Sequence, residues 1–96
     1  MSYSIRPNPI PTNEPFELDL FLQRDNRPVE GARLAVDAAM PQHRHGMNTQ
    51  PVVTATSPGR FHVSGMQFHM PGRWELYFDI TEGAVTERAQ FEVNLE

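Results

Sequence analysis

Histidine and methionine are concentrated in one window of the chain. All four histidines, and every methionine except the initiator, lie between Met40 and Met70. Imidazole nitrogen and thioether sulfur both bind transition metals, and the thioether suits a soft ion such as Cu(I). The rest of the composition is ordinary, so this clustering is the feature that points to a function. The window contains two pieces, residues 40–47 and residues 66–72.

The first piece has the closest spacing of ligand-type residues. His43 and His45 are two residues apart, so in an extended chain their side chains project to the same side, with Cα atoms roughly 6.6 Å apart at about 3.3 Å per residue. Two imidazoles at that separation can converge on one ion at metal–nitrogen distances of about 2.0–2.1 Å. Gly46 permits a sharp turn that returns Met47 toward the same point. A ligand role for these residues is therefore favoured over a solvated polar loop.

The other candidates have competing structural explanations. Met40 continues the inward-facing positions of the alternating segment at 34–38, and methionine commonly fills gaps in a core. Met70 lies in a proline-flanked loop, where ligation and packing are equally supported, and it completes the expected ligand set. Met66 and His69 are loop candidates too, and with Met40 they form a reserve set of ligands. His62 alternates with the inward-facing Phe61 and Val63, so its side chain should point outward, and we expect an ordinary surface residue.

Size, charge and cysteine content exclude several classes of function. A chain of 96 residues forms one small domain, and we take residues 1–96 as that unit, with an edge strand and proline-rich lead-in at 1–13. The net charge is −4 and the arginines are scattered, so nucleic-acid binding has no electrostatic support. The absence of cysteine excludes disulfides and thiolate zinc sites. No stretch reaches the roughly 18–20 apolar residues of a membrane span.

Patterns typical of catalysis are missing as well. Ser57 and Ser64 lack a glycine-flanked nucleophile elbow, and the glycines are too dispersed to form a phosphate-binding loop. A zinc hydrolase could use His43, His45 and His69, but the methionines would then have no role. We therefore expect a protein that is not an enzyme.

Period-two alternation predicts an all-β fold. The clearest strand lies at 74–80, where large apolar residues on one face alternate with polar residues on the other. Six further segments have strand character: 3–6, 16–22, 34–38, 52–56, 61–64 and 85–95. About seven short strands separated by turn residues predict a single antiparallel β-sandwich of immunoglobulin type. The residues expected to be buried are Phe16, Leu18, Leu20, Val36, Phe61, Trp74, Leu76, Phe78 and Phe91.

The dipeptide Met-Pro occurs twice, at residues 40–41 and 70–71. The first copy follows a predicted strand, and the second precedes a strand that can run back antiparallel to it. Both are therefore expected at the same end of the sandwich, where the two metal-prone pieces would meet.

The order of these motifs resembles the YtkA-like family of small bacterial domains. The resemblance covers about residues 16–93 and implies an immunoglobulin-type β-sandwich, usually exported or membrane-tethered, with some members accompanying copper-handling or respiratory-assembly proteins. It implies a periplasmic or extracytoplasmic location for this chain as a mature or trimmed domain, while a cytoplasmic location stays open. His69 and Met66 are not part of the family pattern. The motifs that carry the resemblance are Asp37-Ala-Ala-Met-Pro41, His43-x-His45-Gly46-Met47, Pro51 and Phe68-x-Met70-Pro71-Gly72-x-Trp74-x-Leu76.

Two functional hypotheses follow. The first is a non-enzymatic copper carrier or accessory module that holds Cu(I) with His43, His45, Met47 and Met70, and that contacts a membrane only through an anchor outside this sequence. The alternative is a structural or protein-interaction domain without metal, whose Met- and His-rich loops form an adaptable docking surface. The sequence leaves the physiological metal, the partner and the oligomeric state open.

Overall fold

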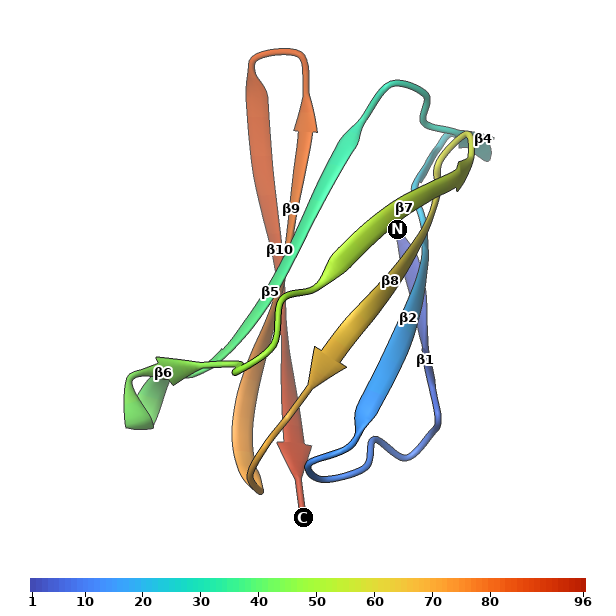
Figure 1. Ribbon diagram of the computed structural model, residues 1–96. Coiled ribbons are helices and arrows are strands. Elements are labelled where there is room, and N and C mark those ends of the chain that lie inside the picture. Colours follow the sequence, from blue (N-terminus) through green and yellow to red (C-terminus); the bar gives the residue numbers. More distant parts are fainter.

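Two antiparallel four-stranded sheets pack face to face in the computed structural model, which describes all 96 residues (Figure 1). The first sheet contains, in spatial order, β1 (Ser2–Arg6), β2 (Pro15–Phe21), β8 (Arg60–Gln67) and β7 (Val52–Ser57). The second contains β10 (Val85–Leu95), β9 (Gly72–Glu82), β5 (Arg33–Met40) and β6 (His45–Gly46). A small hairpin of β3 (Gln23–Arg24) and β4 (Arg27–Pro28) and a 3-10 turn η1 (Pro41–His43) complete the fold. The predicted β-sandwich is confirmed.

Each of the seven predicted strands corresponds to one of the longer strands. The N-terminal strand β1 lies at the edge of the first sheet, as its following prolines predicted. In β9, Trp74, Leu76 and Phe78 are buried, whereas the residues between them are partly exposed. This alternation is the physical basis of the two-layer arrangement, because each strand turns one apolar face toward the opposite sheet. No helix in the structure is both long enough and apolar enough to cross a membrane.

The space between the sheets is filled by one cluster of 15 buried apolar residues, with no buried polar or charged residue among them. Of the nine residues predicted to be buried, eight are confirmed. Phe91 is the exception and is only partly buried. It lies on the edge strand β10, where it packs against Tyr3 and Phe78 at ring-centroid distances of 5.0 and 5.8 Å, and no further strand covers its other side.

The strand β8 is longer than predicted, and the prediction that Met66 lies in a loop is wrong. Period-two alternation from Phe61 and Val63 fails after Ser64 because the register against β2 shifts at this point. Gly65 has φ +77°, and the shift reverses the parity so that Met66 points inward. Met66 is completely buried and belongs to the core.

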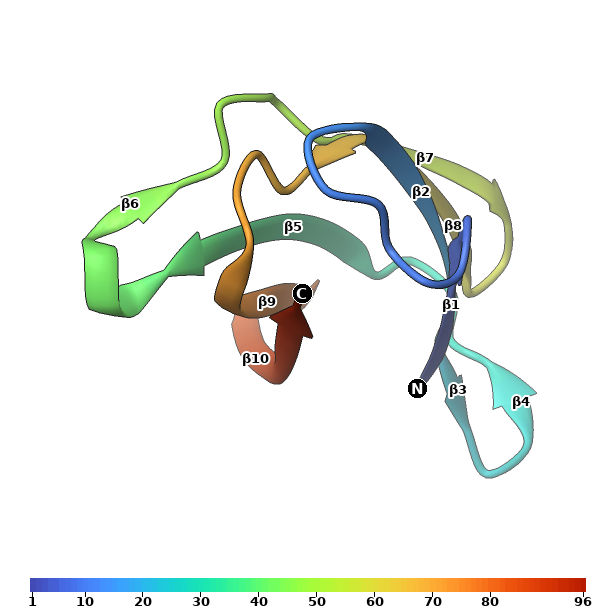
Figure 2. The same ribbon diagram turned by 90° about the horizontal axis from the view of Figure 1, so that it is seen from below.

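Figure 2 shows the two sheets as separate layers, with β6 and its preceding turn projecting from one side of the sandwich. This projecting segment carries His43 and His45, and the β8–β9 turn carries His69 and Met70.

Candidate metal centre

A reversal of the chain after β5 returns His45 to the end of that strand. Met40 is the last residue of β5, η1 follows, and Arg44 then adopts a left-handed conformation with φ 54°. The strand β6 returns beside β5 so that His45 is the direct antiparallel partner of Met40. Opposite residues in such a pair project from the same face with Cβ atoms about 4.5–5.5 Å apart. The Met40 and His45 side chains therefore leave the sheet on the same side.

The β8–β9 turn is held in place by the indole of Trp74. The Phe68 ring stacks on this indole with centroids 4.5 Å apart and an interplanar angle of 10°. The indole Nε1–H donates a hydrogen bond of 3.0 Å to the carbonyl oxygen of Met70. Both rings are fully buried, so the indole forms a fixed wall beneath the turn.

Gly72 connects this turn to Met40. The glycine has φ +133°, and a Cβ at this position would lie 2.5 Å from the Met40 Cε. The thioether methyl of Met40 thus occupies space that any other residue at position 72 would fill. Gly72 is favoured here for its backbone conformation, and a side chain at this position would also require the flexible end of Met40 to shift.

Three imidazoles lie next to one another, and two of them contact the Trp74 indole. The His45 and His69 ring centroids are 5.2 Å apart, and those of His43 and His45 are 5.8 Å apart. Both His45 and His69 meet the indole edge-on, at centroid distances of 6.3 and 5.4 Å. The prediction that residues 40–47 and 66–72 meet at one end of the sandwich is confirmed.

The separation of His45 and His69 fits a shared ion. Two imidazoles that bind one tetrahedral ion at metal–nitrogen distances of about 2.0–2.1 Å have ring centroids about 5 Å apart. The Nδ1 atom of His69 is also buried without a hydrogen-bond partner. A buried polar atom without a partner is costly in free energy, and a metal ion would satisfy this nitrogen. These two observations fit His45 and His69 as a nitrogen pair.

Nitrogen and oxygen ligands alone do not complete a site. No group of three or more histidine, aspartate or glutamate side chains is arranged to hold a metal ion. Two methionines adjoin the imidazole pair along the backbone: Met40 is the strand partner of His45, and Met70 follows His69 in the chain. Two imidazoles with thioether sulfur form a donor set suited to a soft ion.

The remaining predicted ligands lie in different environments. His43 is exposed at the outer side of the imidazole group. Met47 lines a cleft between β5 and the segment that leads to β7, together with Leu34, Val36 and Val53, and is partly buried against the core. The predicted ligand role of Met47 stays a prediction. Met40 has the core position that its parity predicted, with 1% of its surface exposed.

Phe68 is the site residue that the alternation pattern missed. It is completely buried and forms the far side of the Trp74 stack. The signal that could have found it is the parity change at Gly65, since Met66 and Phe68 then share the inward face.

His62 lies outside this group. On the outer face of the first sheet, its Nδ1 is 3.0 Å from an Asp19 carboxylate oxygen and its Nε2 is 3.2 Å from Glu17. Arg6 forms a second ion pair with Asp19 at 2.7 Å. The hydrogen bond that the His62 ring donates to the Asp19 carboxylate, together with the one to Glu17, raises the pKa of His62, and the bond to Asp19 lowers the pKa of Asp19. The predicted outward orientation of His62 is confirmed.

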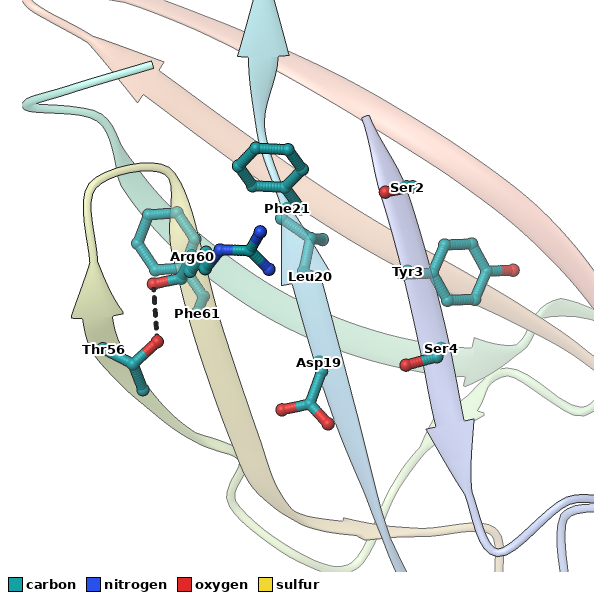
Figure 3. Close-up of a pocket in the computed structure, with 9 residues that line it drawn as sticks. All are labelled: Ser2, Tyr3, Ser4, Asp19, Leu20, Phe21, Thr56, Arg60 and Phe61. Atoms are coloured by element: carbon teal, nitrogen blue, oxygen red, sulfur yellow. Dashed lines mark hydrogen bonds between the residues drawn. The ribbon is translucent and has the colours of Figure 1, made fainter. Parts of the chain in front are cut away.

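A separate hollow lies near these residues. Figure 3 shows it across β1, β2, β7 and β8, with Asp19 and the Phe21 ring in its lining. The Arg60 guanidinium lies 4.3 Å from the centroid of that ring, and Thr56 donates a hydrogen bond to the Arg60 carbonyl oxygen. The lining contains neither histidine nor methionine, so the hollow is unrelated to the imidazole group.

These features define a small all-β sandwich domain with a His/Met group at one end. The family model described as YtkA-like matches residues 3–79 of the chain, and the protein therefore belongs to the YtkA-like family. No curated protein and no solved structure matches it.

Proposed function

We propose that this protein is a non-enzymatic Cu(I)-binding module that acts as a carrier or accessory domain. The observation that supports this most directly is the His45–His69 pair, with centroids 5.2 Å apart and a buried Nδ1 atom of His69 that has no partner. In this proposal the two imidazoles supply nitrogen and Met40 and Met70 supply sulfur. This proposal differs from the set expected from the sequence, which was His43, His45, Met47 and Met70, because His69 lies beside His45 and Met47 lines the cleft beside β5.

Transfer of the ion requires an exposed route to the site. His43 is exposed and its ring lies 5.8 Å from that of His45. In this proposal His43 is not one of the four ligands, but its exposed imidazole takes over the ion from His45 during transfer, so that a partner's ligand enters from the projecting segment. A low-coordinate Cu(I) site with soft ligands permits such exchange. The partner would be a copper-handling or respiratory-assembly protein in an extracytoplasmic compartment.

The alternative, a docking surface without metal, requires accessible methionine side chains. The burial of Met40 and Met66 counts against it, because only part of the methionine surface could then contact a partner. Cu(I) binding explains the His69 nitrogen as well, which a docking surface does not.

The test is an anaerobic titration with Cu(I) in competition with a chromophoric chelator. We expect one equivalent of Cu(I) to bind to the wild-type protein. The His45→Ala/His69→Ala variant should lose most of the affinity, and His62→Gln is the matched control because this histidine lies on the outer face of the first sheet. An unchanged affinity in the double variant, or no binding by the wild type, would refute the proposal.

A further inference from the structure

The edge strand β7 leaves one row of backbone groups without partners. It pairs with β8 on one side and has no strand on the other, as Figures 1 and 2 show. The four backbone hydrogen bonds outside the sheets and helical turns of the chain do not involve it either. An unpaired strand edge of this kind is a template for pairing with another chain.

The other open edges carry residues that discourage such pairing. Arg33 and Asp37 lie on the part of β5 that β6 does not cover, and Arg6 followed by Pro7 ends β1. The edge strand β10 contains Glu87, Arg88, Glu92 and Asn94. Charges and prolines at these positions are the usual protection of a free edge.

The strand β7 has none of this protection. Its sequence, Val-Val-Thr-Ala-Thr-Ser, contains no charged residue and no proline. Four of its side chains are β-branched and the other two are small. Val52 is 55% exposed, one of only three large apolar side chains exposed in the protein. Pro51 and Pro58 limit the free edge to this segment.

We propose that β7 pairs antiparallel with β7 of a second copy of this chain, which joins two four-stranded sheets across a twofold axis. The sequence of the strand favours a second copy as the occupant. In a twofold pairing each side chain meets one from the same strand, so a charge near the axis would face a like charge. A strand without charge is therefore compatible with itself, whereas the charged edges are not.

A twofold axis at Thr54 pairs the two strands so that side chains opposite each other lie on the same face of the joined sheet. Thr54 then faces Thr54 of the second copy, and Val53 faces Ala55. Both pairs keep each side chain on its own face of the joined sheet, because Thr54 is outward and exposed while Val53 is partly buried against the core. The register against β8 shifts between Ala55 and Ser57, which ends the regular pairing at that point.

The test measures molar mass by light scattering during size-exclusion chromatography over a range of concentrations. We expect the wild-type protein to approach twice its 11.0 kDa chain mass as its concentration rises. Thr54→Lys and Thr54→Glu should each weaken self-association by more than about tenfold, since like charges then meet at the axis. A mixture of the two variants should form a mixed dimer, because the opposite charges attract.

The control is Asn94→Lys, which adds the same charge to the exposed edge strand β10 and should leave the dimer unchanged. Circular dichroism of each variant establishes that the sandwich is intact. A wild-type protein that stays monomeric at its solubility limit would overturn the proposal. Dimers of unchanged strength in both Thr54 variants, or a mixture that does not associate, would overturn it as well.

Discussion

Met40 and His45 are direct partners in the antiparallel pairing of β5 with β6. One of the two residues is buried in the core, and the other belongs to the projecting segment that carries the imidazoles. Their side chains leave the sheet on the same face, where the His45 ring centroid lies 6.3 Å from that of Trp74. A residue that packs the core is thereby placed beside a histidine that can bind a metal ion.

Two substitutions of Met40 separate its packing in the core from its proposed role as a copper ligand. Met40→Leu keeps the volume of the side chain, so the free energy of unfolding should fall by less than about 1.5 kcal/mol. Met40→Ala leaves a cavity and should cost about 2–5 kcal/mol. If the sulfur binds copper, the leucine variant should show weaker Cu(I) binding in a chelator competition while its urea midpoint stays close to that of the wild type. Wild-type Cu(I) affinity in the leucine variant would remove Met40 from the ligand set.

Trp74 reports on the site directly because it is the only tryptophan of the chain. An ion held by His45 and His69 would lie beside the indole, whose ring they both contact edge-on. We expect the tryptophan emission to be quenched in proportion to Cu(I) up to one equivalent. The His45→Ala/His69→Ala variant should show no saturable change, and quenching of equal size in that variant would place the ion elsewhere.

Gly72→Ala should destabilise the fold through two separate effects. The backbone has φ +133°, and the new Cβ would meet the Met40 Cε, so the free energy of unfolding should decrease by about 2–4 kcal/mol in urea denaturation. Gly83→Ala is the control: its φ is +59° and no atom lies within 4 Å of the added Cβ, so only the backbone cost of about 1 kcal/mol applies.

A second substitution, at Met40, isolates the steric part of the destabilisation by Gly72→Ala. In the Met40→Ala/Gly72→Ala double variant the colliding methyl is absent, so the two costs should sum to more than the cost of the double variant. Strict additivity would show that the methionine moves aside without cost.

The ion pairs of His62 predict a pH dependence of stability with two limits. The pKa of His62 is raised above 6.5, so its contribution is fully present below about pH 6.5 and is lost as the pH rises through the folded-state pKa. The pKa of Asp19 is lowered below 3.8, so its contribution is present above that value and is lost as the pH falls through the folded-state pKa.

His62→Gln should remove the upper of these two limits. In the wild-type protein, we expect the urea midpoint to decline from pH 6 toward pH 8 by more than in this variant. A titration of the His62 ring by nuclear magnetic resonance gives its pKa directly, and a value at or below 6.5 would contradict the prediction.

The sequence predicts the sandwich well because period-two alternation is a direct consequence of a sheet with one buried face. It fails where the alternation itself changes, as at Gly65, after which Met66 and Phe68 take the inward face that Phe61 and Val63 occupied before. It also overstates burial on an edge strand, as at Phe91, because alternation does not show whether another strand lies beyond.

The arrangement of the two His/Met pieces was predicted in part. The spacing of the Met-Pro steps predicts that the two pieces meet, but not which side chains face each other. That depends on the left-handed residue Arg44 and on the short β6 pairing, which place His45 rather than Met47 beside Trp74. Neither feature has a signature in the sequence, because the left-handed conformation is at an arginine rather than a glycine.

The positions of His45 and His69 also affect how the chain is held together. His45 belongs to the second sheet, whereas His69 lies in the turn by which the chain leaves the first sheet. This protein has no cysteine, and an ion shared by the two imidazoles would act as a cross-link at this end of the sandwich. Closing a loop of a few tens of residues in this way reduces the entropy of the unfolded chain by an amount worth on the order of 3 kcal/mol. Release of the ion to a partner would remove this constraint, so the emptied protein would unfold more readily than the loaded one.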